Sequence, residues 1–206
     1  ETLLSKDQLK AHRKAEKKAQ KERDKEAEEK ANLFVIDFSG SMDAHEVEGL
    51  REEITAVLTV ATEKDEVLVK VESGGGVVHG YGLAASQLQR IKDKGIKLTI
   101  AVDKVAASGG YMMACVADTI IASRFAIIGS IGVIAQLPNF NKILKKNDIE
   151  FEQHTAGEYK RTLTMFGENN DAGREKFREE LEDVHVMFKG FVQQHRPDLD
   201  IDKVAT

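Results

Sequence analysis

The feature that most constrains this chain is a corner of small residues between two apolar runs. Residues 98–102 are apolar and β-branched in character, residues 106–110 read Ala-Ala-Ser-Gly-Gly, and residues 111–117 are apolar again. The pattern predicts a buried strand, a tight turn at Ser108 and a buried helix. Many hydrolases present a nucleophilic serine at such a turn, but with a glycine two residues earlier, where this chain has Ala106. On these residues alone, close packing of a helix against a sheet explains the corner better than catalysis does.

Expected strands and helices alternate through most of the chain, which indicates an α/β fold. The expected strands are residues 32–38, 66–72, 97–102, 118–122, 126–134 and 149–154. The expected helices are residues 44–62, 81–94, 138–146 and 171–195, together with the helix after Ser108. This alternation predicts a parallel sheet with right-handed crossovers. Sites in such sheets form at the carboxyl ends of the strands, where this chain has its small-residue turns.

Residues 1–31 are dense in Lys, Arg, Glu and Ala and predict a charged helical arm before a domain that spans residues 32–206. Only a thin stripe of alanines and leucines runs along this arm. A solvated spacer therefore fits it better than a membrane-surface helix, which would carry Trp or Phe to insert. The sequence begins with Glu1 rather than Met, so we expect it to be a fragment.

Composition excludes several classes of function. The formal net charge of −5 argues against a broad nucleic-acid-binding surface. Cys115 is the only cysteine, which rules out an internal disulfide, and its apolar surroundings predict a core position. No apolar run is long enough to span a membrane. No two histidines have metal-binding spacing on one helix, and we expect no cofactor.

A serine needs a base, and Lys160 is the candidate that we favour among the lysines. A lysine can act as a base once its amine is neutral. Lys160 follows an expected strand in a turn that contains Gly157 and Tyr159, away from the obviously solvated faces. One surface lysine among many is the simpler interpretation of this residue taken alone. Spacing also leaves open a triad in which His79 or His154 serves Ser108.

Two further motifs lie at expected strand ends. The first, Ser-Gly-Gly-Gly at residues 73–76, could bring backbone N–H groups close to a ligand and build an oxyanion hole, or could be a flexible turn. The second, at residues 37–41, resembles the metal-binding motif of von Willebrand A domains, with Asp37, Ser39 and Ser41 as Mg²⁺ ligands. That family also needs a threonine and an aspartate on later loops, and no threonine turn fits.

Taken together, four motifs resemble the signal peptide peptidase A family of serine peptidases. They are Glu-Ser-Gly-Gly-Gly at residues 72–76, Val-Ala-Ala-Ser-Gly-Gly-Tyr at 105–111, Gly-Ser-Ile-Gly-Val at 129–133 and Gly-Glu-Tyr-Lys-Arg at 157–161. The resemblance covers residues 32–206 and implies a ClpP/crotonase-type fold of repeated ββα units. It also implies a role for each matching residue: Ser108 as nucleophile, Lys160 as general base, Ser130 as the hydroxyl that orients the lysine, and Gly76 and Gly109 as oxyanion-hole residues.

The same resemblance implies a context for the activity. It predicts peptide or unfolded-protein substrates, a homo-oligomer in which neighbouring protomers can share the serine–lysine dyad, and a place at the bacterial inner membrane with the catalytic domain facing the periplasm. The family's N-terminal membrane anchor is absent from this sequence, and its domain continues past residue 206. Gly74 replaces a proline of the family's motif, which loosens the loop. The rival with the same fold, a crotonase-type acyl-CoA enzyme, would use carboxylates instead of the dyad.

Overall fold

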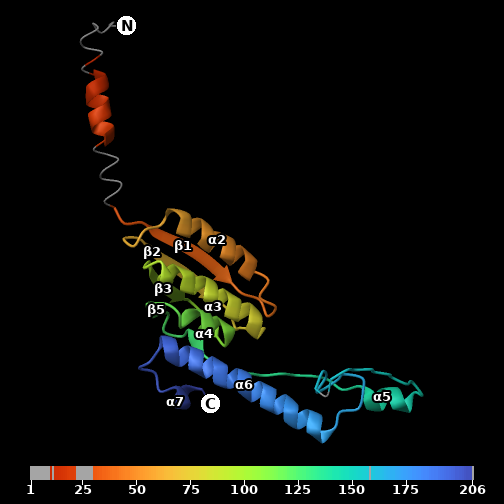
Figure 1. Ribbon diagram of the computed structural model, residues 1–206. Helices are drawn as coiled ribbons and strands as arrows, with labels where there is room; N and C mark the ends of the chain where they lie inside the picture. Colours follow the sequence, from red (N-terminus) through yellow and green to blue (C-terminus); the bar gives the residue numbers. More distant parts are fainter. Residues whose placement is uncertain (1–9, 11, 22–29, 158, 206) are drawn as a thin grey trace.

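A computed structural model describes residues 10, 12–21, 30–157 and 159–205 of the chain. Its centre is a four-stranded parallel sheet with the strand order β1-β2-β3-β5 (Figure 1). These strands are β1 (Leu33–Ser39), β2 (Glu66–Glu72), β3 (Lys97–Val102) and β5 (Thr119–Ala122). The expected α/β fold with a parallel sheet is confirmed.

Two helices cover one face of the sheet, α2 (Val47–Val60) and α3 (Val78–Asp93) (Figure 1). The strands bury alternate side chains against them; in β2 these are three valines, Val67, Val69 and Val71. The expected stop signal of α3 is confirmed, because Gly95 follows the helix with φ +75° and donates to the carbonyl of Lys92. The opposite face is less covered, and Leu33 is 56% exposed there.

A second, two-stranded parallel sheet carries the corner that the sequence singled out. It pairs β4 (Val105–Ala107) with β6 (Ile127–Gly129). Ser73 extends this sheet from the end of β2: its N–H donates to the carbonyl of Val105 at 2.9 Å, and its carbonyl accepts from Ala107 at 3.0 Å. The short strand β4 was not expected. Its pairing fixes the end of β2 directly beside the turn at Ser108.

Residues 133–170, the projecting segment, extend away from the body of the molecule and lead into the start of α6 (Asp171–His195), which runs back to the body (Figure 1). The strand expected over residues 149–154 is wrong, and the one over 126–134 is cut to β6. Both predictions fail because the projecting segment offers no neighbouring strand to pair with. The helix expected from residue 138 is shorter and begins later, as α5 (Asn141–Lys146).

Helix α6 joins the projecting segment to the core. The second half of α6 buries Phe188 and Val192 in the core, beside α4 (Gly109–Ala114). After the helix, the guanidinium of Arg196 donates to the carbonyl of Ala117 at 2.6 Å. A short helix that was not expected, α7 (Ile201–Val204), follows near the end of the chain.

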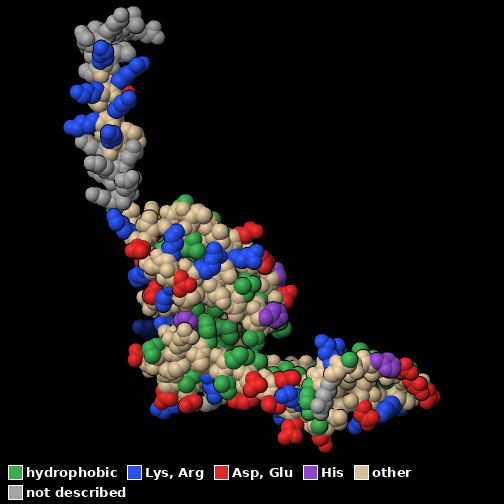
Figure 2. All heavy atoms as spheres, viewed as in Figure 1, with side chains coloured by type: hydrophobic (Ala, Val, Ile, Leu, Met, Phe, Trp, Pro, Cys, Tyr) green, Lys and Arg blue, Asp and Glu red, His purple; other side chains and the backbone are tan. Residues whose placement is uncertain are grey.

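The N-terminal arm is only partly described. Residues 12–21 are helical, as expected, and Figure 2 shows their Lys and Arg side chains projecting around the helix. The rest of the expected arm, residues 1–9 and 22–29 above all, lies outside the described residues, so the domain boundary at residue 31 stays a prediction. No helix in the described part of the chain combines the length and the apolar character that crossing a membrane requires.

Candidate active site

Ser108 occupies a strained turn between β4 and α4. Its φ of 52° and ψ of −119° lie outside the regions that L-residues ordinarily adopt. The turn persists because its surroundings hold it: Ser108 donates its N–H to the carbonyl of Gly129 at 2.7 Å and accepts from the N–H of Met112 at 2.9 Å. Strain of this kind at a strand-to-helix turn is typical of a positioned nucleophile.

The glycine loop after β2 packs directly against this turn. A Cβ on Gly75 would lie 2.5 Å from the backbone nitrogen of Gly109 and 2.7 Å from Cβ of Ser108, so no larger residue fits. Gly75 also has φ +86°, which only glycine adopts without strain. Among the described residues, the N–H groups of Gly76 and Gly109 donate to no acceptor. Two free backbone donors beside a serine are the components of an oxyanion hole.

Ser108, Gly76 and Gly109 line one small pocket of about 70 Å³. Its remaining wall is largely apolar and contains Val78, Met112, Gly132, Val133, Ile134, Val184 and Phe188. Figure 2 shows hydrophobic side chains exposed between the sheet region and α6. The pocket therefore suits an apolar side chain of an extended ligand that presents a carbonyl to Ser108.

The structure brings Ser130 near the serine but leaves Lys160 elsewhere. Ser130 directly follows Gly129, whose carbonyl accepts from Ser108, and has a φ of 54°. Lys160 is exposed in the projecting segment, does not line the pocket and has no hydrogen bond to Ser108. Its neighbour Tyr159 lies 5.7 Å below the ammonium of Lys176, near the start of α6.

Lys160 and the pocket lie beside different parts of α6, because Tyr159, the neighbour of Lys160, contacts Lys176. The pocket is lined by Val184, which lies eight residues beyond Lys176, or roughly 12 Å at the rise of an α-helix. Of the residues predicted for catalysis, the folded chain thus brings together Ser108, Gly76 and Gly109, with Ser130 next to them, but not Lys160.

The geometry supports neither a histidine base for Ser108 nor the metal site expected at residues 37–41. His79 and His154 do not line the pocket, and His154 pairs with Glu152 in the projecting segment. Asp37 pairs with Lys70 at 2.7 Å, whereas the hydroxyl of Ser41 donates within its own loop, so these two predicted metal ligands are held by different partners. Within the described residues, no group of three or more His, Cys, Asp or Glu side chains could hold a metal ion.

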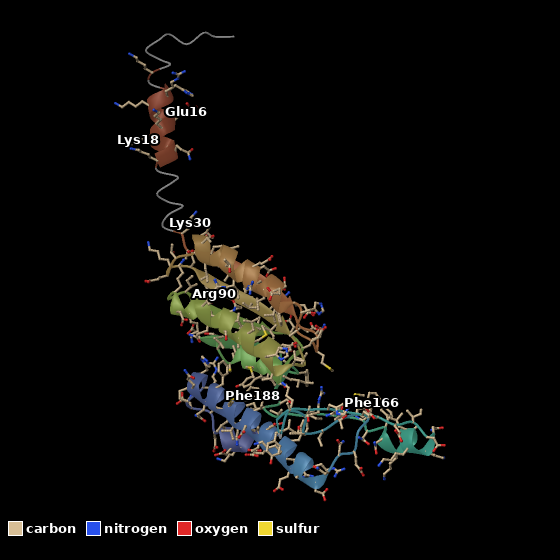
Figure 3. All side chains as sticks on the ribbon, turned by 45° about the vertical axis from the view of Figure 1, so that its right-hand side comes forward. Glu16, Lys18, Lys30, Arg90, Phe166 and Phe188 are labelled. Atoms are coloured by element: carbon tan, nitrogen blue, oxygen red, sulfur yellow. The ribbon has the colours of Figure 1, made fainter. Side chains whose placement is uncertain are left out.

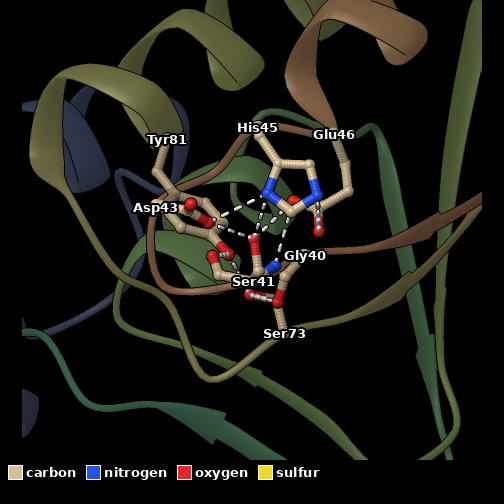
Figure 4. Close-up of polar contacts among 7 residues, drawn as sticks. All are labelled: Gly40, Ser41, Asp43, His45, Glu46, Ser73 and Tyr81. Atoms are coloured by element: carbon tan, nitrogen blue, oxygen red, sulfur yellow. Dashed lines mark hydrogen bonds and ion pairs between the residues drawn. The ribbon is translucent and has the colours of Figure 1, made fainter.

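A polar cluster lies on the loop after β1 (Figure 4). This loop contacts the glycine loop, because a Cβ on Gly76 would clash with the backbone of Met42. The hydroxyl of Ser41 contacts Asp43 at 2.7 Å and Glu46 at 2.8 Å, and His45 lies 3.0 Å from Asp43. The hydrogen bonds from Ser41 and His45 lower the pKa of Asp43 to about 2, and the bond to Asp43 raises the pKa of His45. The cluster is exposed and internally satisfied, so it orders the loop rather than presenting a reactive group.

Burial keeps two other ionisable groups near the turn protonated. Desolvation raises the pKa of Tyr81 above its usual value, so its hydroxyl remains a hydrogen-bond donor. Desolvation likewise raises the pKa of Cys115 to about 12. The thiol is fully buried, which confirms the predicted core position and makes it an unreactive group.

Sequence reasoning missed the apolar lining of the pocket and the buried tyrosine behind it. Tyr81 reads as one more apolar residue on the buried side of α3, and Val184 and Phe188 read as core residues of α6. One feature of the sequence could have indicated Tyr81: its hydroxyl lies among the buried apolar residues of α3, and a buried hydroxyl needs a hydrogen-bond partner. Nothing in the sequence could have placed α6 against the pocket, because that contact joins residues far apart along the chain.

Comparison with known proteins agrees with the resemblance drawn from the motifs. The profile of the Peptidase family S49 N-terminal region matches residues 1–88, and that of Peptidase family S49 matches residues 90–206. The probable protease SohB of Buchnera aphidicola is 63% identical over 176 residues, which are 85% of this chain and 52% of that protein. The probable protease SohB of Haemophilus influenzae is 61% identical over 178 residues, 86% of this chain and 50% of that protein.

The chain thus spans about half the length of the curated relatives it matches. The expected ClpP/crotonase-type fold agrees with the alternating strands and helices and with this match. A von Willebrand A domain belongs to a different family and is excluded as a description of these residues. With profiles that cover both halves and relatives near 60% identity, the chain belongs to peptidase family S49.

Proposed function

We propose that this chain carries the nucleophile and oxyanion hole of a serine peptidase that cleaves peptide bonds through a serine–lysine dyad. The observation that supports this most directly is Ser108 on its strained turn, in one pocket with Gly76 and Gly109, whose N–H groups have no acceptor in the described part of the chain. Membership of a peptidase family fits the same chemistry.

In the proposed reaction, the oxygen of Ser108 forms a bond to the peptide carbonyl carbon while the neutral amine of Lys160 takes the hydroxyl proton. The N–H groups of Gly76 and Gly109 stabilise the oxyanion. The lysine ammonium then gives its proton to the leaving amine as the C–N bond breaks. Water hydrolyses the acyl-enzyme and restores the serine, with no metal or cofactor required.

We propose that Lys160 reaches Ser108 from a neighbouring copy of the chain. The support is the position of Lys160 in a segment that projects from the body of its own protomer (Figure 1). A homo-oligomer could place this segment against the next protomer's pocket. Ser130, which lies beside Ser108, would then orient the incoming lysine.

The proposed substrates are peptides or unfolded proteins that place apolar side chains in the pocket. The lining by Met112, Val184 and Phe188 supports this preference. We also propose attachment to the bacterial inner membrane with this domain in the periplasm, as the family resemblance implies. Protease protection of the full-length protein in spheroplasts tests the orientation, because a periplasmic domain is digested without cell lysis.

The decisive experiment uses full-length protein with an apolar fluorogenic peptide. Ser108→Ala should lower kcat by about 10⁴-fold or more while the thermal unfolding midpoint stays unchanged. Co-refolded Ser108→Ala and Lys160→Ala, each inactive alone, should regain about a quarter of wild-type activity if neighbours share the dyad. Unchanged activity in Ser108→Ala would refute the proposed peptidase site, and an inactive mixture would place the dyad within one protomer.

A further inference from the structure

The oxyanion loop has an unusual need for external support. Residues 74–76 are three consecutive glycines, the residue type with the greatest backbone freedom. An oxyanion hole works only when its donors are already fixed before charge develops. Something outside these glycines must therefore hold the loop against Ser108.

The hydroxyl groups of Ser73 and Tyr81 supply that support. Oη of Tyr81 donates to the carbonyl of Ser41 at 2.7 Å and lies 2.5 Å from Oγ of Ser73 (Figure 4). The tyrosine proton is used on the carbonyl of Ser41, so the single hydroxyl proton of Ser73 is shared between two acceptors: Oη of Tyr81 at 2.5 Å and the carbonyl of Gly40 at 3.2 Å, of which the shorter contact favours Tyr81. Oγ of Ser73 then accepts from the N–H of Gly75 at 3.0 Å. The chain of bonds thus ends on the middle glycine of the loop.

The ring of Tyr81 touches the other side of the hole. A Cβ on Gly109 would lie 2.3 Å from Cγ of Tyr81, so the backbone of Gly109 rests directly on the ring. Phe38 meets the same ring edge-on, with centroids 6.5 Å apart. Tyr81 is 0% exposed, and a Cβ on Gly40 would lie 2.5 Å from its hydroxyl, so the side chain is tightly enclosed.

We propose that Tyr81 is a positioning residue that holds both donors of the oxyanion hole in place. Its hydroxyl, through Ser73, fixes the loop of Gly75 and Gly76, and its ring supports the backbone of Gly109. The inference rests on the proposed function. Tyr81 does not line the pocket and acts only through these neighbours. It anchors the loop to the end of β1, where the cluster around Ser41 holds the other end of the network.

The test removes the hydroxyl and keeps the ring. Tyr81→Phe in the full-length protein should lower kcat by about 10- to 100-fold with KM within about twofold, because oxyanion stabilisation acts on the transition state rather than on substrate binding. Tyr111→Phe is the matched control: Tyr111 is also buried, but its hydroxyl has no hydrogen-bond partner within the described residues. This control should keep wild-type kcat and KM.

A double-mutant cycle separates positioning from a general loss of packing. Ser73→Ala should lower kcat as Tyr81→Phe does, and the double variant should be no slower than the slower single variant, since both break one chain of bonds. Independent effects would multiply, and that result would overturn the proposal. So would a kcat for Tyr81→Phe within twofold of Tyr111→Phe.

Two outcomes keep the proposal distinct from the proposed function. If Tyr81→Phe does not fold, Ser73→Ala carries the test: reduced kcat with unchanged KM supports the proposal, and unchanged kcat overturns it. If Ser108→Ala retains activity, the peptidase assignment itself fails. Active wild type, inactive Ser108→Ala and a fully active Tyr81→Phe would refute only the role of Tyr81.

Discussion

Ser108 lies among buried residues on the turn between β4 and α4, whereas Lys160 lies in a projecting segment with one short helix and largely exposed side chains (Figure 1). The first region is fixed by backbone hydrogen bonds from three directions, through Gly129, Met112 and the neighbouring Ser73. The second is held by a small cluster of Phe140, Phe151 and Phe166 with ring centroids 5.7 and 6.1 Å apart.

This contrast shows which half of the candidate site one folded chain can build. The proposed nucleophile and oxyanion donors lie on two turns that pack against each other in one core, so the folded chain positions them by itself. The projecting segment buries little against its own body, and its exposed apolar side chains, such as Ile143 and Ile149, suit contact with another surface. This contrast supports the proposal that a neighbouring copy completes the site.

Of the changes that compare the two regions, removing the amine of Lys160 should have the largest effect on activity, without changing stability. Lys160→Ala should reduce peptidase kcat by about 10⁴-fold or more, because the serine loses its base. The thermal unfolding midpoint should not move, because the side chain is exposed and makes no contact with the core.

The matched control for this variant is Lys142→Ala, an exposed lysine in the same segment. It should keep wild-type kcat. Equal activity in the two variants would show that Lys160 is an ordinary surface lysine, and the comparison between the two regions would lose its catalytic meaning.

Two phenylalanines, both labelled in Figure 3, allow the stability of the core and of the projecting segment to be compared. Phe188 on α6 is buried in the core, so Phe188→Ala should lower the free energy of unfolding by about 3 to 5 kcal/mol. Phe166 in the projecting segment is 41% exposed, so Phe166→Ala should cost about 1 kcal/mol or less. Urea denaturation followed by circular dichroism measures both.

Equal losses in these two variants would contradict the comparison, because they would mean that the projecting segment unfolds together with the core as one cooperative unit. If the stability lost in Phe166→Ala depends on protein concentration, the projecting segment is stabilised by contacts within an assembly, which would support the contrast between the two regions.

The smallest expected change is in the pH dependence of stability, and it concerns a carboxylate that binds the residue just before β1. The carboxylate of Asp65 accepts from the N–H groups of Asn32 and Thr62, each at 2.7 Å, and these bonds lower its pKa to about 2. A lowered folded-state pKa stabilises the fold above the unfolded value of about 4, and this contribution disappears as the pH falls from 4 toward 2.

Asp65→Asn should therefore be less stable than wild type at pH 7, with a difference that narrows below pH 4. Thermal melts across this pH range measure it. A difference that stays constant from pH 7 to pH 2 would mean that the charge of Asp65 contributes nothing to the stability of the fold.

Much of the fold could be predicted because it depends on local patterns. The alternating valines of β2, the long apolar stripe of α6 and the stop signal at Gly95 each report their own element. The predictions for residues 130–134 and 149–154 failed for the opposite reason. Apolar, β-branched residues favour a strand, but a strand exists only where a neighbour completes its hydrogen bonds.

Neighbouring residues were enough to predict the alternation of strands and helices, the buried corner at Ser108 and, through four motifs, the family, because each depends on a local pattern. The packing of the elements, in contrast, sets the pairing of Ser73 with β4, the position of Tyr81 under Gly109 and the separation of Lys160 from the pocket of Ser108. These relations join residues far apart along the chain. Their geometry follows from how the elements pack, which no local pattern encodes.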